Sequence, residues 1–460
     1  MIYTAGNLAS KVISFVMIFF ITFYLTKEEI GLYDIIITTI AVLSPFVNLQ
    51  LTDAILRWML DGGTENNASK IFTNVICLFL LCTLTFVFFY AVVSHFVSIS
   101  YELLILLLIL AQSLLPLLLM MARGDGKNVL FAFSGVIYSA IYTLLTLSLI
   151  IIYEYKIEGL LLANIAATFI TSFFVLITGG YYSSFNIKLL DFRFSRELLI
   201  FSLPMIPNAL AWWLYTSANR YVVLYYLGLE NSGIWAIAYK IPTILAILNS
   251  VFFMAWQEKS IREYKSPNRD NYYSETLQKF VSLSMGAVIV LVAASKPILY
   301  FIVEKSFFIS WQYSVFLLLA SFFQSLALFY GVGYICGKET KYILSTTIIG
   351  SVCTIILSIA LTPFFGLFGA GIGTLLGFFI MFLIRLQQTK KYFTIRFPLL
   401  KTMLMLAAVC ICYGFSYFES VAIQLFNVVF ALSIAIYTNK DFLKGKLNQL
   451  KQIYETRKYA

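Results

Sequence analysis

Long apolar runs, separated by short polar stretches, follow one another along almost the whole chain. A run of about 20 apolar residues is long enough for an α-helix to cross the hydrocarbon core of a bilayer. The longest connection, residues 258–278, is polar and contains Pro267. The pattern therefore predicts an all-α polytopic membrane protein with no room for a soluble domain. Its fourteen predicted helices cover residues 4–26, 34–58, 71–94, 101–122, 129–153, 158–180, 198–227, 232–257, 279–303, 312–336, 342–363, 368–386, 400–417 and 421–437.

Composition supports this fold class and narrows the chemistry. Of the 460 residues, 61% are hydrophobic and 12% are charged, whereas soluble domains carry about 25% charged residues. A large soluble core is therefore excluded. The six cysteines mostly lie inside apolar runs and form no CxxC pair, and His95 is the single histidine. We expect no disulfide, no metal site and no cofactor.

Basic residues gather in alternate connections. If the N-terminus is cytoplasmic, the even-numbered connections and the tail hold 21 Lys and Arg residues, against Lys27, Lys156 and Lys305 in the odd-numbered loops. Cytoplasmic loops are enriched in Lys and Arg, so we expect both termini in the cytoplasm. This topology also accounts for the net charge of +10 without a nucleic-acid partner.

Two stretches about two hundred residues apart read alike. Tyr24–Asp34 is YLTKEEIGLYD and Tyr226–Ala236 is YLGLENSGIWA, and at one offset Gly31 aligns with Gly233. We expect each copy to be a short acidic loop at equivalent helix ends, six helices apart. A parallel repeat of this kind predicts two lobes that handle substrate at their interface. The expected organisation is a six-helix lobe, a second six-helix lobe, an appended helix pair and a basic cytoplasmic tail, over residues 1–182, 183–397, 398–439 and 440–460.

A second pair of matching positions between the two halves consists of small residues. Gly159 and Ala163 align with Gly369 and Gly373 at a common offset. Gly369, Gly373 and Gly377 lie four residues apart, which is typical of a face for close helix packing in membranes. Gly369, Gly371 and Gly373 are not a dinucleotide fingerprint, because no strand precedes them.

Charged and polar side chains inside the apolar runs are the candidate functional residues, because a charge at a helix centre costs about 2.5–3.5 kcal/mol on insertion scales. Arg220 and Lys240 have no acidic partner within their own predicted helices. Cations in a cavity favour an anion, and arginine binds phosphate through its planar fork. Aromatic side chains near them offer flat faces to sugars. The candidates for substrate binding are Arg220, Lys240, Arg57, Lys11, Trp212, Tyr215 and Asn219, and those for ion coupling are Asp34 and Asp53.

Structural interpretations of the same charges remain open. Asp53 and Arg57 are four residues apart and can form an ion pair within their helix. Asp34 can pair with Arg220 or Lys240, which would favour a structural role. Lys11 can extend to the cytoplasmic surface.

Several motifs together resemble a known family. They are Gly6, Ser10, Lys11 and Phe15 in the first run; Leu25, Glu29, Gly31 and Tyr33 after it; Asp53, Ala54 and Arg57 at the end of the second; and Asn219–Arg220, Leu227–Gly228, Gly233 and Tyr239–Lys240 in the second half. In this pattern the chain resembles bacterial polysaccharide flippases of the O-antigen and capsule repeat-unit type, in the multidrug/oligosaccharidyl-lipid/polysaccharide exporter superfamily. One departure is the short stretch before the first helix, where relatives usually carry a few more basic residues.

The resemblance implies a function. Such a protein moves an undecaprenyl-pyrophosphate-linked oligosaccharide from the cytoplasmic to the outer leaflet of the bacterial inner membrane by alternating access of two lobes, often coupled to an ion gradient. Arg220, Lys240 and Arg57 would meet the pyrophosphate. The expected partners are the lipid-linked oligosaccharide and membrane lipids, together with a polysaccharide polymerase and a chain-length regulator.

Four alternatives remain open at this point. A lipid II-type flippase would share the fourteen helices and the cationic residues. A drug or cation antiporter of the same superfamily would usually have twelve helices and a cluster of buried acidic residues. In this chain only Asp34 and Asp53 are candidates for such buried acidic residues. A membrane polymerase or glycosyltransferase would need a long extramembrane or Asp-rich catalytic loop, so we do not expect an enzyme. A structural scaffold would leave Arg220 and Lys240 without a role.

Overall fold

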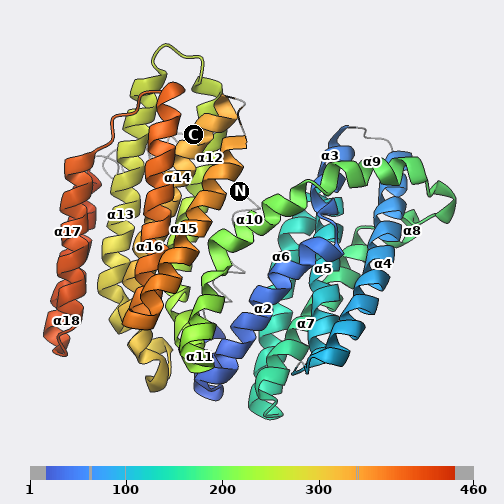
Figure 1. Cartoon of the computed structure of the whole chain (residues 1–460), viewed down its shortest axis with the longest axis horizontal. Helices are drawn as coiled ribbons and strands as arrows, with labels where there is room; N and C mark the ends of the chain where they lie inside the picture. The colour runs from blue at the N-terminus through green and yellow to red at the C-terminus, as the bar shows by residue number, and fades with distance from the viewer. Residues whose placement is uncertain (1–16, 62–64, 99, 338, 340, 441–460) are drawn as a thin grey trace, which may run out of the picture. The chain divides into compact units, whose positions relative to one another are not determined.

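The computed structural model describes residues 17–61, 65–98, 100–337, 339 and 341–440 (Figure 1). Within these residues, 13 helices are long and apolar enough to cross a membrane. They correspond in order to the second through fourteenth predicted helices, so the all-α polytopic fold class is confirmed. The first predicted helix, residues 4–26, lies mostly outside the described part of the chain, although residues 17–24 are helical.

The chain divides into two compact units. The first contains the residues up to Leu224 together with Gly228–Gly233, and the second contains Tyr225–Leu227 and the residues from Ile234 onward. The helices of the first unit are α2 (Lys27–Val47), α3 (Leu51–Asp61), α4 (Glu65–Phe96), α5 (Glu102–Gly124), α6 (Asn128–Leu147), η1 (Ser148–Ile152), α7 (Lys156–Thr178), α8 (Tyr181–Ser184), η2 (Ile187–Leu189), α9 (Phe192–Ser202) and α10 (Met205–Ser217). Helix α11 (Asn219–Ala238) passes from the first unit to the second.

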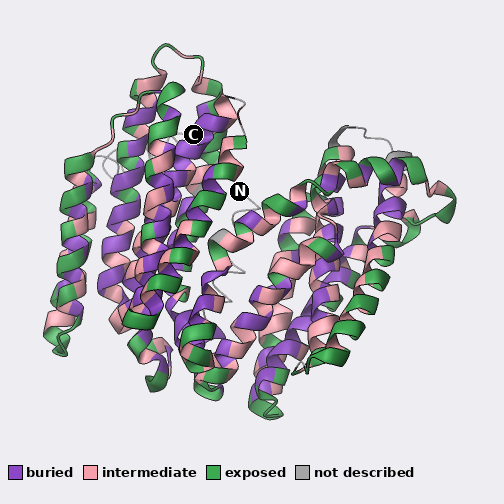
Figure 2. Ribbon diagram, in the orientation of Figure 1, coloured by how far each residue is buried: buried purple, intermediate pink, exposed green. Residues whose placement is uncertain are grey.

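The second unit is a bundle of long helices with a peripheral pair. Its helices are α12 (Lys240–Glu263), α13 (Arg269–Ile302), η3 (Lys305–Ser310), α14 (Trp311–Cys336), α15 (Lys341–Phe365), α16 (Leu367–Gln388), η4 (Thr389–Lys391), α17 (Leu399–Ser416) and α18 (Val421–Thr438). Both α17 and α18 pack on α13 (Figure 1). Their other faces are largely exposed (Figure 2), as expected for helices that face lipid.

The second predicted helix is wrong as a single element. Residues 34–58 form parts of two helices, α2 and α3, because Leu49 and Gln50 adopt the left-handed conformation with φ of 50° and 53°. The buried Asn48 stabilises this turn, since its Oδ1 accepts a hydrogen bond of 2.9 Å from the Gln50 amide. Short polar side chains that bond to the backbone two residues on favour turns over helices.

The two repeated stretches were expected to be loops, and this expectation is wrong. Helix α2 begins at Lys27, directly after Thr26, whose hydroxyl accepts from the Glu29 amide while the Glu29 side chain accepts from the Thr26 amide. This capping box satisfies two amides at the helix start. In the second copy, Gly228 breaks α11 at φ 78°, a left-handed conformation that favours glycine. Each copy is therefore a break followed by a helical turn.

Within the first unit, the even-numbered connections lie at one end. Lys70 pairs with Asp191 at 2.8 Å, and Lys127 donates to the Gly179 carbonyl at 2.8 Å. The hydrogen bond from Lys70, helped by the Phe194 amide, lowers the pKa of the Asp191 carboxyl. In the second unit, Lys391 and Glu339 likewise join two even-numbered connections at 2.8 Å. This arrangement agrees with the alternation of helices predicted from the charges.

The three spaced glycines of α16 form the predicted packing face. A Cβ on Gly369 would lie 2.7 Å from the Thr362 amide nitrogen, and one on Gly373 would lie 2.6 Å from the Ser358 amide nitrogen. A Cβ on Gly377 would lie 2.7 Å from the Thr354 Cα. Helices α15 and α16 thus approach backbone to backbone, which only small residues permit.

We predict that Gly377→Leu strongly destabilises the second unit. The new side chain would collide with the backbone of α15, and overpacking typically costs about 1–3 kcal/mol or more. The matched control is Gly414→Leu, because a Cβ on Gly414 meets nothing within 4 Å. Thermal denaturation of the detergent-purified proteins should show a lowered Tm for Gly377→Leu alone. Equal Tm values for both variants would contradict close packing of α15 and α16.

Candidate functional site

An ion pair between α2 and α11 is the centre of the candidate site. Arg220 Nε donates to the Asp34 carboxylate at 2.6 Å. Both residues belong to the first unit, and their side chains are 18% and 23% exposed. The pairing of Asp34 with Arg220, one of the two considered from the sequence, is therefore present. A charge-assisted bond of this length is among the stronger hydrogen bonds in proteins.

Two further side chains fasten the same region to α2. Trp213 on α10 donates its indole N–H to the Thr38 carbonyl at 2.8 Å. The Tyr221 hydroxyl on α11 bonds to the Thr39 hydroxyl at 2.5 Å. The rings of Trp213 and Tyr221 also contact each other, with centroids 5.7 Å apart. These bonds hold the α10–α11 region against α2 and so fix the position from which Arg220 reaches Asp34.

One turn before Asp34, the two repeated stretches lie directly against each other. A Cβ on Gly31 would collide with the Leu229 carbonyl oxygen and lie 2.9 Å from the Gly233 amide nitrogen. Reciprocally, a Cβ on Gly233 would collide with the Lys27 carbonyl oxygen. Lys27 and Glu230 form an ion pair of 2.7 Å beside this contact. The glycines aligned by the repeat are thus the residues that permit the close approach.

A buried polar network continues from the site into the first unit. Tyr33, next to Asp34, shares a hydrogen bond of 2.8 Å with Tyr142 and accepts one of 3.0 Å from Asn164. Asn164 Oδ1 in turn accepts bonds from Gln112 at 3.0 Å and from Tyr138 at 2.9 Å. Buried polar groups need such partners, so this network fixes α2 relative to α5, α6 and α7.

Other predicted site residues lie in different places. Asn219 is buried beside Arg220 on α11, whereas Trp212 on α10 is 39% exposed. Arg57 and Asp53 are both exposed on α3. Lys240 is exposed at the start of α12 and belongs to the second unit. Lys11 and the side chain of Tyr215 fall outside what the structure describes.

Comparison with protein families gives a match over residues 1–257, to the family described as "Polysaccharide biosynthesis protein". The chain belongs to this family. No curated protein matches the chain. Membership agrees with the resemblance seen in the sequence motifs and places the chain among proteins that act in polysaccharide synthesis.

Solved structures of low sequence identity share the fold of this family member. A structure titled "Lipid II flippase MurJ, inward closed conformation" superposes with a TM-score of 0.72 at 14% identity, over 97% of this chain and 99% of that one. An inward-facing multidrug resistance MATE family transporter of the MOP superfamily gives 0.64 at 13% identity, over 88% and 96%. The Vibrio cholerae MATE transporter VcmN in the bent form gives 0.52 at 14% identity, over 86% and 99%. This polysaccharide biosynthesis protein is thus a multi-pass membrane protein with the fold of flippases and transporters.

The polar network behind Asp34 in this family member was not predicted from the sequence. Tyr33, Tyr138 and Tyr142 are ordinary members of apolar runs, so their pattern gives no signal. Asn164 and Gln112 do give one, since uncharged amides in the middle of membrane helices commonly bond to neighbouring helices. The buried Arg385 of α16 was also missed; it donates to the Thr346 hydroxyl at 3.0 Å and to the Ala327 carbonyl at 3.0 Å.

We predict energetic coupling between Asp34 and Arg220 in the polysaccharide biosynthesis protein. Asp34→Asn and Arg220→Gln should each lower stability, and the double variant should lose less than the sum of the two. The coupling should be about 1–3 kcal/mol, as for contacting charges in one network. Chemical denaturation of the four proteins in detergent measures it. Additive losses would show that the pair contributes nothing as a pair.

We also predict that Gly31→Ala destabilises the first unit, because its methyl group would meet the backbone of Leu229. The control is Gly135→Ala, since a Cβ on Gly135 meets nothing within 4 Å. In a helix, alanine is favoured over glycine by about 1 kcal/mol, so the control should match or exceed the wild-type Tm. A Tm for Gly31→Ala at or above that of the control would contradict the close backbone contact.

Proposed function

We propose that the chain is a flippase that translocates undecaprenyl-pyrophosphate-linked oligosaccharide repeat units across the bacterial inner membrane for surface polysaccharide synthesis. The observation that carries the proposal is the Asp34–Arg220 pair, a part-exposed cation with an acidic partner, in a polysaccharide biosynthesis protein with a flippase-type fold. The proposed topology places both termini in the cytoplasm, as the distribution of basic residues predicts. Polymerase and chain-length regulator are the proposed partners.

Exchange of counter-ions explains how the pair would act. In the absence of substrate, Asp34 compensates the charge of Arg220. An incoming pyrophosphate would replace the carboxylate, because it carries more negative charge and accepts two parallel hydrogen bonds from the guanidinium. Arg220 then keeps an anionic partner in both states, so that its charge is compensated throughout.

The remaining candidate residues complete the proposal. Lys240 and Arg57 are proposed as further cations for the pyrophosphate, and Lys11 as a fourth at the start of the chain. Trp212, Tyr215 and Asn219 are proposed to contact the glycan, since aromatic faces and amides suit sugar rings and hydroxyls. Once its ion pair with Arg220 is broken, Asp34 would bind the ion that is coupled to transport. Asp53 is the second candidate for this ion-coupling role.

Deletion of the gene in its native host tests the function. We expect loss of surface polysaccharide, with intact lipid-linked repeat units accumulating on the inner leaflet of viable cells. Unchanged surface polysaccharide would overturn the proposal. Growth arrest with accumulation of lipid II would instead assign the lipid II-type activity.

Complementation of the deletion tests Arg220. We predict that Arg220→Ala lowers surface polymer by about 10- to 100-fold, as expected for loss of one charge-assisted contact. Arg220→Lys should recover part of it, because lysine keeps the charge but not the fork. The control is Arg262→Ala, whose side chain is 76% exposed and pairs with Glu258 one turn away. Full activity of Arg220→Ala at matched membrane levels would contradict a phosphate role.

A further inference from the structure

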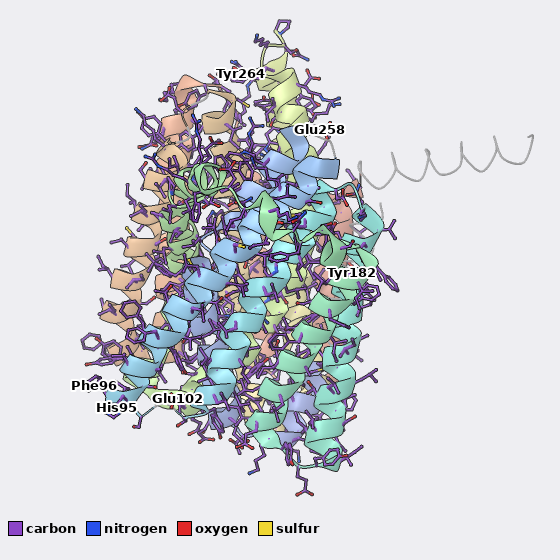
Figure 3. The ribbon with its side chains drawn as sticks, turned by 90° about the vertical axis from the view of Figure 1, so that its right-hand side faces the viewer. His95, Phe96, Glu102, Tyr182, Glu258 and Tyr264 are labelled. Atoms are coloured by element: carbon purple, nitrogen blue, oxygen red, sulfur yellow. The ribbon has the colours of Figure 1, made fainter. Side chains whose placement is uncertain are left out.

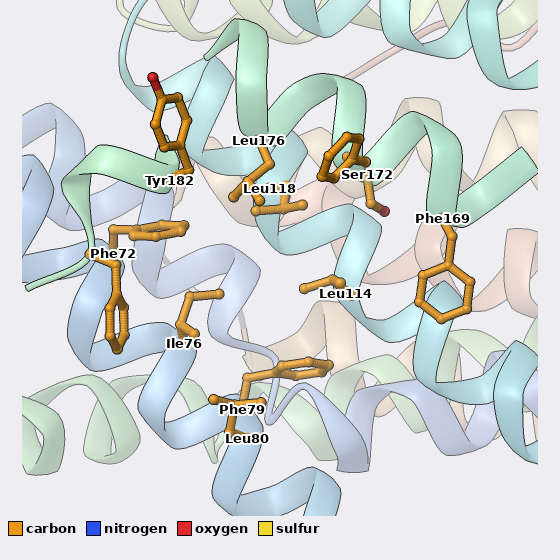
Figure 4. Close-up of a pocket in the computed structure, with 12 residues that line it drawn as sticks. Phe72, Ile76, Phe79, Leu80, Leu114, Leu118, Phe169, Ser172, Leu176 and Tyr182 are labelled. Atoms are coloured by element: carbon orange, nitrogen blue, oxygen red, sulfur yellow. The ribbon is translucent and has the colours of Figure 1, made fainter. Parts of the chain in front are cut away.

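An apolar groove lies on the surface of the first unit, away from the Asp34–Arg220 pair. Helices α4 and α7 provide its walls and α5 its floor (Figure 4). Its volume is about 390 Å³, within the roughly 300–1,000 Å³ typical of small-molecule sites. Phe79 and Leu80 come from α4, Leu118 from α5, and Phe169 and Phe173 from α7.

The connection that follows α7 lines one end of the groove. Tyr182 lies there beside Phe72 of α4 (Figure 4), and Phe185 of the same connection also lines the groove. This connection is fastened to α4, since the Asn186 amide donates to the Thr73 hydroxyl at 3.1 Å. The Asn74 side chain donates to the Leu189 carbonyl at 3.0 Å. The connection that lines this end is therefore held to α4.

Basic residues occur on the segments next to this end of the groove. The Lys127 ammonium lies 5.0 Å from the centroid of the Tyr181 ring, which stacks at 5.8 Å on the ring of Phe72 in the groove. Lys188 is exposed three residues after Phe185. Arg193 and Arg196 follow it on the exposed face of α9. In Figure 3, Tyr182 lies apart from His95, Phe96 and Glu102, which mark the end of α4 and the start of α5. Lys127 is itself paired with Asp125 at 2.5 Å, so the basic character of this end comes from Lys188, Arg193 and Arg196. The length of the groove is lined by uncharged residues.

We infer that the groove binds an anionic phospholipid of the surrounding bilayer. One hydrocarbon chain lies between α4 and α7, and the phosphate sits at the end lined by Tyr182 and Phe185, near Lys188. Apolar surface is stabilised by hydrocarbon contact, and basic pockets between membrane helices bind anionic headgroups. The exposed Phe192, beside Arg193 on α9, suits the boundary between headgroups and chains.

The groove is better suited to a bilayer lipid than to the transported lipid. Its lining comes from α4, α5, α7 and the connection after α7. The Asp34–Arg220 pair instead lies between α2 and α11. Lipid in the groove can therefore remain bound while substrate is exchanged, and the inference does not depend on the proposed function.

Native mass spectrometry of the full chain in detergent tests the site with phosphatidylglycerol and phosphatidylcholine of identical chains. We expect wild type to retain phosphatidylglycerol in preference to phosphatidylcholine. Lys188→Glu should weaken phosphatidylglycerol binding on the order of 5- to 30-fold, because it reverses one charge near the phosphate. The control is Lys305→Glu, at an exposed lysine of the second unit.

A second pair of variants tests the groove itself. Leu80→Trp places a larger side chain in the groove and should lower retention of both lipids. Leu84→Trp is the matched control, because Leu84 lies one turn further along α4, is 70% exposed and does not line the groove.

Four results would each overturn the inference. These are equal retention of the two lipids by wild type, unchanged binding by Lys188→Glu, equal effects of Leu80→Trp and Leu84→Trp, or stronger retention of a polyprenyl phosphate than of phosphatidylglycerol. Size-exclusion chromatography establishes that each variant is folded. If Leu80→Trp does not fold, the Lys188→Glu comparison decides alone.

Discussion

The close backbone contact between Gly31 and the Gly228–Gly233 segment sets the geometry of the candidate site. Any larger residue at Gly31 would push the segment away from α2. Asp34 lies three residues after Gly31 on α2, so the contact determines how far Arg220 must reach to its carboxylate. The Lys27–Glu230 pair supports the contact from the side. The glycines aligned by the repeat therefore hold Asp34, the last residue of the first copy, close to Arg220.

The bilayer imposes a second constraint, because it offers no water to satisfy polar groups. Asn164 shows how the first unit meets it: three donors bond to its Oδ1, and its amide group donates to Tyr33. At the edge of the second unit, Lys296 donates to the carbonyls of Ser416 and Phe418 at the end of α17. Polar side chains in this chain thus join helices as well as marking sites.

Hydrophobic runs predicted thirteen of the helices because the thickness of a bilayer fixes their length. The same runs could not predict the break at Leu49–Gln50, since it falls inside the apolar run 34–58. Near Gly228 they predicted an interruption between residues 227 and 232, but not that helical turns continue on both sides of it. Spaced glycines predicted the α15–α16 contact, because small residues leave a periodic pattern. The charged site was predicted as a set of alternatives: pairing of Asp34 with Arg220 or with Lys240 depends on contacts between distant segments, which spacing within one helix does not encode.

Arg385 and Arg220 differ in how deeply they are buried and in the groups they bond to. The difference supports a structural role for Arg385 and the proposed exchange of anionic partners for Arg220. Arg385 is 2% exposed, and its bonds to hydroxyls and carbonyls of α14 and α15 cannot be replaced without opening the helix packing. Arg220 is more exposed and bonds to a carboxylate that is itself partly exposed. An anion of higher charge can approach such a pair without prior unfolding, and the displaced carboxylate retains access to solvent or to a proton. In the proposed function, partial burial would leave the Asp34–Arg220 pair strong enough to hold the site and open enough for its partner to be exchanged.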